Sequence, residues 1–164
     1  MRRLRSTAAA MLVASLALAG GCHRKPIEAA KLDFTLKDMS GHDVRLADFK
    51  GKPIIINFWS TTCGPCRLET PELVDLAAKY RSQGLTILGI SVDDTPEDIR
   101  TFATEFKVPY PLLVGADRED VQDALGLGDG IPMSVFISRS GNVYGRLEGL
   151  ATPAFLDKQI NALF

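Results

Sequence analysis

Residues 54–66 read IIINFWSTTCGPC, and the rest of the 164-residue chain can be understood outward from this stretch. Its first six residues are almost all apolar, which is typical of a central strand covered on both faces. Two cysteines follow, Cys63 and Cys66, and helical periodicity then continues to about Arg81. A strand, a sharp turn and a helix therefore place two thiols at the start of a helix, where the dipole and the free N–H groups stabilise negative charge.

The two-residue spacing between the cysteines predicts thiol–disulfide exchange. It places both sulfurs on one helical turn with Cα atoms about 5–6 Å apart, as a disulfide requires. We expect Cys63 to be the exposed nucleophile and Cys66 the shielded resolving cysteine, joined as a disulfide in the oxidised state. A zinc site would need two further ligands, and the other candidates, His23, His42 and Cys22, all lie far upstream. No metal or cofactor is therefore expected.

The composition is that of a single globular domain. Hydrophobic residues make up 46% of the chain and charged residues 24%, and a chain of this length can form a hydrophobic core that needs no structural disulfides or metals. Three cysteines are too few for a disulfide scaffold. The net charge of -1 argues against nucleic acid as a partner.

The first 21 residues have the pattern of a secretory signal peptide. Three arginines near the start precede an apolar stretch of about a dozen residues, which is shorter than a membrane span. Residues 18–22 read LAGGC and resemble a bacterial lipobox, so we expect Cys22 to be lipidated and to anchor the protein to the membrane. Ala19 departs from that pattern, and cleavage before Gly20 would instead leave a soluble periplasmic protein. The predicted parts are a signal peptide at 1–21, a lipidated tether at 22–31 and a domain at 32–164.

The domain is predicted to alternate strands and helices. Apolar alternation around glycine turns indicates a hairpin at 34–46 and a second one at 133–148. Threonine followed by proline marks two further helix starts, at Thr95 and Thr152. The expected order is ββ-βαβα-βα-ββα, which gives a mixed sheet with helices on both faces.

Local signals predict further details of the helices. Pro71 lies inside the first helical pattern and should kink it, and Asp117 should cap a short helix that ends at Gly126. The buried stripe of the first helix is predicted to comprise Leu68, Leu73, Leu76, Ala77 and Tyr80. The inward residues of the last helix are predicted to be Phe155, Leu156, Ile160 and Leu163.

These features together resemble the thioredoxin superfamily. The resemblance rests on the pattern NFWSxxCGPC at 57–66, on Pro71 five residues later, and on Ile131-Pro132 before a strand. The N-terminal hairpin, Asn57 and the long segment before the second proline motif are similar to the TlpA/ResA-like branch of extracytoplasmic thiol–disulfide oxidoreductases. The resemblance covers about residues 32–164. It implies an α/β thioredoxin fold, a central mixed sheet flanked by helices, with an N-terminal β-hairpin and a helical insert.

The resemblance also implies how substrates bind. The loop of Ile131 and Pro132 would face the dithiol with a cis peptide bond, and the Ile131 backbone would pair with a bound substrate strand. Trp59 would pack beside the site and form part of the docking surface. Gly64 and Pro65 would tune the redox couple, because this dipeptide resembles that of reducing thioredoxins, whose potentials are about -270 mV.

The proton acceptor for Cys66 is a separate question. Cytoplasmic thioredoxins carry a buried Asp where this chain has Asn57, which cannot titrate. By resemblance, an acid after the second strand takes that role, and Asp94 is favoured over its neighbour Asp93. The alternative that both acids merely lead into the next helix stays open. Glu69, one turn past Cys66, is a weaker candidate and is expected to be solvated.

The expected function is reduction of disulfides in extracytoplasmic client proteins, with electrons from a membrane donor of the thioredoxin-reductant relay type. A thiol peroxidase is one alternative, because the N-terminal segment also resembles that of peroxiredoxins. Their motif needs Pro seven residues and Thr or Ser three residues before the cysteine, and here Ser60 fits but Ile56 does not. A non-catalytic binding module is the other alternative, and the intact dithiol argues against it.

Overall fold

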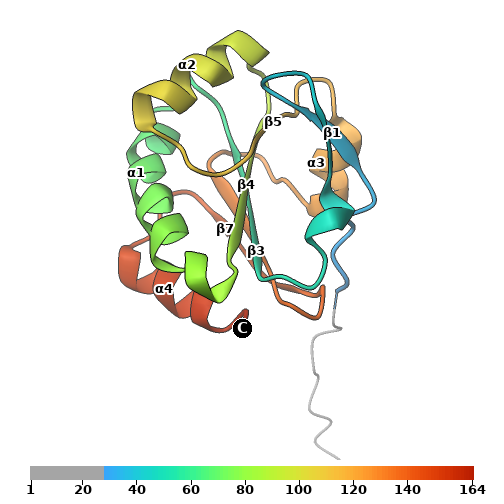
Figure 1. Cartoon of the computed structure of the whole chain (residues 1–164), viewed down its shortest axis with the longest axis vertical. Coiled ribbons are helices and arrows are strands. Elements are labelled where there is room, and N and C mark those ends of the chain that lie inside the picture. Colours follow the sequence, from blue (N-terminus) through green and yellow to red (C-terminus); the bar gives the residue numbers. More distant parts are fainter. Residues whose placement is uncertain (1–27) are drawn as a thin grey trace, which may run out of the picture.

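The computed structural model describes residues 28–164 (Figure 1). The predicted signal peptide, Cys22 and most of the predicted tether lie outside these residues. The order ββ-βαβα-βα-ββα is confirmed, and α1 runs without interruption through Pro71. The elements are β1 (Thr35–Asp38), β2 (Asp43–Arg45), a 3-10 turn (Leu46–Phe49), β3 (Ile54–Trp59), α1 (Gly64–Lys79), a second 3-10 turn (Arg81–Gln83), β4 (Thr86–Ser91), α2 (Pro96–Phe106), β5 (Leu112–Val114), α3 (Glu119–Leu125), β6 (Met133–Ile137), β7 (Val143–Glu148) and α4 (Pro153–Asn161).

The strands form one mixed sheet in the order β2-β1-β5-β4-β3-β6-β7. The central strand β3 pairs in parallel with β4 and antiparallel with β6, and all six of its residues are buried. This position explains its uninterrupted apolar sequence, because both of its faces are covered. The two predicted hairpins, β1–β2 and β6–β7, are present and antiparallel.

Helices cover both faces of the sheet, as predicted (Figure 1). On one face, α1 and α4 pack against Ile55 and Phe136, and α2 packs against Trp59 beside them. On the other face, α3 supplies Val121 and Leu125 to a separate apolar cluster. Successive residues of a strand point to opposite faces, so the odd-numbered residues of β3 face the α1 layer.

Three local predictions are wrong. Leu68 is 73% exposed and Phe155 is 39% exposed, because each lies one position away from the buried stripe of its helix. In α4 that stripe contains Leu156 and Ile160, which are four residues apart. Asp117 does not cap α3: its φ angle is 57°, outside the extended conformation of an N-cap, and the helix begins two residues later without a side-chain cap.

The first described residues contact the second hairpin. Residues 28–30, expected to belong to the tether, lie beside residues 141–143 at the start of β7, where the N–H of Val143 donates to the carbonyl of Glu28 at 2.7 Å. The carboxylate of Glu28 also forms an ion pair with Arg146 on the same strand. These contacts join positions more than a hundred residues apart, so local sequence patterns contain no signal for them.

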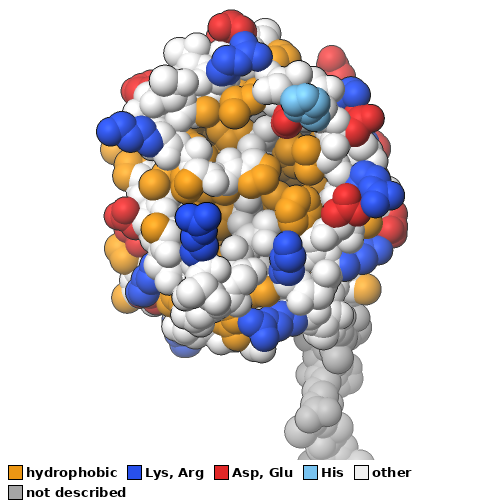
Figure 2. Space-filling model, in the orientation of Figure 1, with side chains coloured by type: hydrophobic (Ala, Val, Ile, Leu, Met, Phe, Trp, Pro, Cys, Tyr) orange, Lys and Arg blue, Asp and Glu red, His pale blue; other side chains and the backbone are white. Residues whose placement is uncertain are grey.

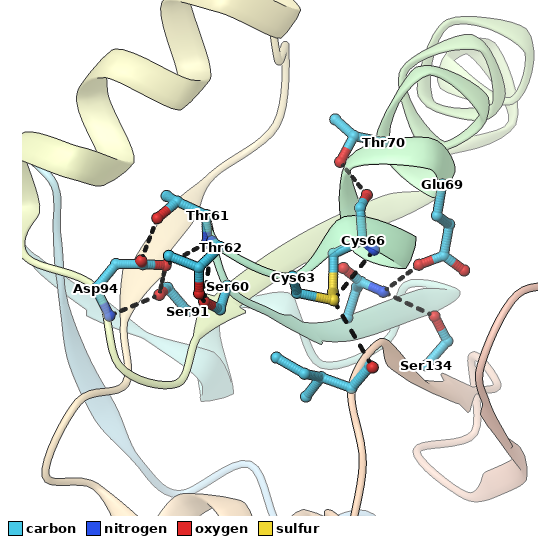
Figure 3. The surroundings of a disulfide bond; sticks show 12 residues. Ser60, Thr61, Thr62, Cys63, Cys66, Glu69, Thr70, Ser91, Asp94 and Ser134 are labelled. Atoms are coloured by element: carbon cyan, nitrogen blue, oxygen red, sulfur yellow. Dashed lines mark hydrogen bonds between the residues drawn. A yellow bond between two sulfur atoms is a disulfide. The ribbon is translucent and has the colours of Figure 1, made fainter.

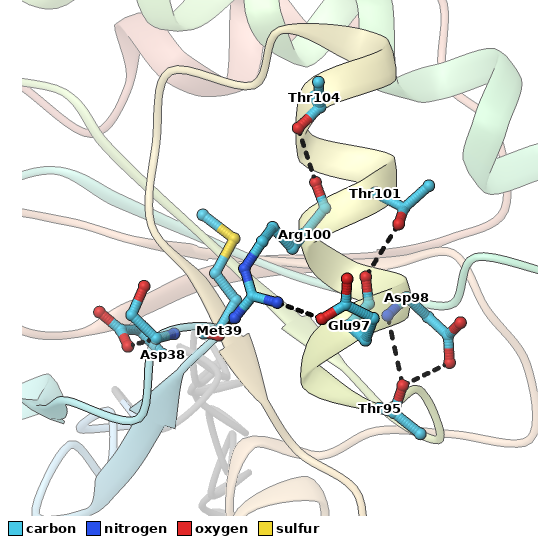
Figure 4. A network of polar contacts seen from close by, with 9 residues as sticks. Asp38, Met39, Thr95, Glu97, Asp98, Arg100, Thr101 and Thr104 are labelled. Atoms are coloured by element: carbon cyan, nitrogen blue, oxygen red, sulfur yellow. Dashed lines mark hydrogen bonds and ion pairs between the residues drawn. The ribbon is translucent and has the colours of Figure 1, made fainter.

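Polar contacts join the first hairpin to α2 (Figure 4). The guanidinium of Arg100 donates to the carbonyl of Met39, in the turn between β1 and β2, at 2.6 Å. Thr95 caps α2 as predicted, because its hydroxyl accepts a hydrogen bond from the N–H of Asp98 at 3.2 Å. The first of these contacts fixes α2 to the first hairpin.

The face of the molecule in Figure 2 carries hydrophobic, acidic and basic side chains. Hydrophobic side chains gather near the centre of this face, and charged side chains of both signs lie around them. None of the helices in residues 28–164 is long and apolar enough to cross a membrane.

Candidate active site

The two cysteines lie where β3 ends and α1 begins (Figure 3). Cys63 is the N-cap of α1 and is partly exposed, whereas Cys66 is 2% exposed. They form a disulfide with Cα atoms 5.3 Å apart. Gly64 and Pro65, between them, are exposed. The oxidised protein therefore has one accessible and one shielded sulfur, as the spacing predicts.

Two backbone groups approach the sulfur of Cys63. The N–H of Cys66 donates to it at 3.1 Å, and the carbonyl oxygen of Ile131 lies 3.7 Å away. The Ile131–Pro132 peptide bond is cis, as predicted, and its loop lies against the dithiol. Because N–H groups at the start of a helix stabilise an anion, the first contact favours a thiolate on Cys63 once the disulfide is reduced.

Trp59 does not occupy the predicted place on the docking surface. Its side chain is 3% exposed and packs against Phe102, with ring centroids 4.3 Å apart, in a cluster that also contains Cys66. As an odd-numbered residue of β3 it points into the layer between the sheet and the helices. Trp59 therefore supports the dithiol from inside, and the first turns of α1 expose Leu68 together with Pro65.

Glu69 is buried rather than solvated, which corrects the prediction. It is 5% exposed, and its Oε2 accepts a hydrogen bond from Nδ2 of Asn57 at 3.0 Å. The same Nδ2 donates to the hydroxyl of Ser134 at 3.1 Å. The other oxygen, Oε1, has no hydrogen-bond partner among residues 28–164. Burial raises the pKa of Glu69 to about 7, and the hydrogen bond from Asn57 only partly opposes this.

The helical spacing carried a signal for this buried acid. Cys66, Glu69, Thr70 and Leu73 follow the three- and four-residue intervals of the buried side of α1, and Leu68 does not. A stripe chosen by hydrophobicity alone misses Glu69 and Thr70 because both are polar. The spacing places Glu69 one turn from Cys66 on the same side of the helix.

Asp94 lies on the other side of the dithiol from Glu69 (Figure 3). It is 7% exposed, and both of its carboxylate oxygens are occupied. Oδ1 accepts from the hydroxyl of Thr61 at 2.5 Å, and Oδ2 accepts from the Thr61 N–H at 2.8 Å and from the hydroxyl of Ser91 at 2.5 Å. Within residues 28–164, its hydrogen bonds go to Thr61, in the turn before Cys63, and to Ser91, at the end of β4, and not to either sulfur.

The sulfurs of Cys63 and Cys66 are bonded to each other in this structure. Such a bond opens and re-forms by exchange with another dithiol or disulfide. The fold and the site therefore define a thiol–disulfide oxidoreductase with a thioredoxin-like fold. The AhpC/TSA family profile matches residues 27–146, and the chain belongs to this family.

Similar proteins support the same class. The thiol-disulfide oxidoreductase ResA of Geobacillus kaustophilus is 33% identical over 132 residues, which cover 80% of this chain and 74% of ResA. A thiol:disulfide interchange protein of Chlorobium tepidum, of known structure, aligns over 85% of this chain and 98% of its own, with 29% identity and a TM-score of 0.76. A secreted disulfide oxidoreductase of Mycobacterium tuberculosis shares the fold with a TM-score of 0.73 and 24% identity, over 80% of this chain and 97% of its own. The predicted fold and enzyme class are confirmed.

Proposed function

We propose that this protein reduces disulfides of client proteins outside the cytoplasm and is re-reduced by a membrane electron donor. The direction is supported by the Gly64-Pro65 dipeptide, which resembles that of reducing thioredoxins. The compartment is supported by the signal-peptide pattern and by the likeness to a secreted relative. Lipidation of Cys22 belongs to the same proposal, and cleavage before Gly20 would leave the protein soluble in that compartment.

The exchange transfers two electrons from the dithiol to the client. The Cys63 thiolate attacks one sulfur of the client disulfide, so a mixed disulfide forms and the second client sulfur leaves as a thiolate. Cys66 then loses its proton and attacks the sulfur of Cys63. The mixed disulfide breaks, the Cys63–Cys66 disulfide forms, and the client leaves with both sulfurs reduced. The client thiolates take up protons from solvent.

Glu69 is the group that we assign to accept the proton of Cys66, in place of Asp94. A carboxyl group with a pKa of about 7 accepts and returns protons near neutral pH, which is what a general base needs. Glu69 is buried one helical turn from Cys66, and its Oε1 has no partner among the described residues. Asp94 fits the role less well, because donors from Thr61 and Ser91 occupy both of its oxygens.

The observation that carries the proposal is the pairing of a partly exposed Cys63 with a buried Cys66 in one disulfide. The test uses the Cys66→Ala variant and oxidised insulin as the disulfide substrate. The variant should accumulate a mixed disulfide on Cys63, seen by mass spectrometry and removed by dithiothreitol. The Cys63→Ala variant is the matched control and should form none. No adduct on Cys66→Ala, or equal adducts on both variants, would contradict the mechanism.

A redox titration of the unsubstituted protein against dithiothreitol and glutathione tests the direction. A midpoint of about -270 mV fits a reductase, whereas a midpoint of about -120 mV belongs to strong oxidants. The rate with hydrogen peroxide, measured on the same sample, addresses the peroxidase alternative. Reduction of peroxide faster than reduction of insulin would favour that alternative.

A further inference from the structure

The turn between β3 and α1 is held by one residue from outside it. Within the turn, the carbonyl of Ser60 accepts from the N–H of Cys63 at 3.2 Å, and the hydroxyls of Ser60 and Thr62 lie 3.0 Å apart. Thr61, at the middle of the turn, directs its N–H and its hydroxyl to the carboxylate of Asp94. Among residues 28–164, Asp94 is the one residue beyond the turn and its helix that forms hydrogen bonds to these three turn positions.

Asp94 is itself fixed to the end of β4. The hydroxyl of Ser91 donates to Oδ2 of Asp94 at 2.5 Å and accepts from the N–H of Asp94 at 3.2 Å. Ser91 is the last residue of β4 and pairs with Trp59, the last residue of β3. Asp94 therefore closes a ring of contacts that runs from β3 to β4 and back to the turn (Figure 3).

This ring of contacts ends at Thr61, close to Cys63 in the chain. Cys63 follows Thr61 by two residues and caps α1, and its sulfur gains stabilisation as a thiolate only while it stays within reach of the N–H of Cys66. We propose that Asp94 is a positioning residue, which holds the turn so that the Cys63 thiolate forms against the first turn of α1. The inference rests on the proposed role of Cys63 as nucleophile, and it requires no contact between Asp94 and the client.

A role of Asp94 through its charge would have the opposite sign. A nearby carboxylate disfavours a thiolate, so removal of the charge alone would make Cys63 more reactive at a given pH. Loss of positioning makes Cys63 less reactive, because its sulfur moves away from the Cys66 N–H. The direction of the change in Asp94→Asn therefore separates the two roles.

The experiment measures alkylation of Cys63 by iodoacetamide across pH in the reduced protein, with the modified peptide identified by mass spectrometry. At about pH 6, Asp94→Asn should react about fivefold more slowly, the size expected for a weakened capping hydrogen bond, and its midpoint should move to higher pH. Asp93→Asn is the matched control, because it makes the same charge change at the exposed neighbouring position. An unchanged or faster reaction in Asp94→Asn would overturn the proposal.

A second pair of variants covers the case in which Asp94→Asn does not fold. Thr61→Val removes the hydroxyl that binds Asp94 while it keeps the side-chain shape, and Thr61→Ser keeps the hydroxyl. Thr61→Val should slow alkylation and Thr61→Ser should restore the rate of the unsubstituted protein; equal rates in both would overturn the proposal. Insulin reduction by the unsubstituted protein tests the proposed function separately, since alkylation reports the state of Cys63 without any client.

Discussion

Glu69 and Asp94 are two buried carboxyl groups on opposite sides of one dithiol, and their surroundings differ (Figure 3). Glu69 receives one hydrogen bond, from Asn57, and its Oε1 has no partner among residues 28–164. Asp94 receives three, two from Thr61 and one from Ser91. The two side chains are almost equally buried, at 5% and 7% exposure, so burial alone does not distinguish them.

The number of donors decides what each acid is suited to do. A buried carboxyl group with few donors favours its neutral form, so its pKa rises and it exchanges a proton near neutral pH. A buried carboxylate with several donors connects the elements that supply them. Glu69 thus fits proton transfer and Asp94 fits the positioning of the turn, although the family resemblance favoured Asp94 as the proton acceptor and Glu69 was expected to be solvated.

The largest expected effect is on the step that releases the client. Replacing Glu69 by Gln keeps the shape and removes the proton acceptor, so decay of the mixed disulfide at neutral pH should slow about a hundredfold. Rapid mixing of the reduced protein with oxidised insulin, followed by acid quench and mass spectrometry, measures this decay. Asp75→Asn, an exposed acid on the same helix, is the control and should decay normally. Normal decay in Glu69→Gln would assign the proton to another group.

The same substitution should change how stability depends on pH. The pKa of Glu69 is about 7 in the folded protein and 4.5 as a free side chain, so folding favours the protonated form. The unsubstituted protein should therefore be most stable with respect to Glu69 below about pH 4.5 and lose about 3 kcal/mol as the pH rises to about 7. Urea unfolding of the oxidised protein at several pH values, compared with Glu69→Gln, isolates this loss. A difference between the two proteins that stays constant with pH would mean that Glu69 is not perturbed.

At neutral pH, Asp94→Asn should lower the free energy of unfolding, whereas Glu69→Gln should not. The amide can present only one acceptor oxygen, so at least one donor from Thr61 or Ser91 loses its partner, at a cost of about 1.5 kcal/mol. Glu69→Gln at the same pH should instead leave the protein as stable or more stable. Urea unfolding at about pH 7.5 measures both variants together. Two changes of the same sign would remove the distinction between the two acids.

The parts that were predictable from the sequence are those that depend on local patterns. The apolar run at 54–59 and the C-x-x-C spacing each contain their own signal, and the observed β3 and disulfide agree with them. The cis peptide bond at 131–132 was implied by the family resemblance, and it is present. The burial of Glu69 depends on helix phase, which its polar character concealed. The hydrogen bonds from Thr61 to Asp94 join residues 33 positions apart, which no local pattern contains.

The smallest expected effect is on the pKa of Glu69 when its hydrogen-bond donor, Asn57, is replaced. The hydrogen bond from Asn57 lowers the pKa of Glu69 against the effect of burial, so Asn57→Leu, which also keeps water out, should raise that pKa above about 7. Carbon-13 NMR of the Glu69 carboxyl group across pH, in the oxidised protein, measures the change directly. Ser134→Ala is the matched control, because it removes the other partner of Asn57 and leaves the bond to Glu69 in place. A fall of the Glu69 pKa in Asn57→Leu would mean that water, rather than the single donor, sets its value.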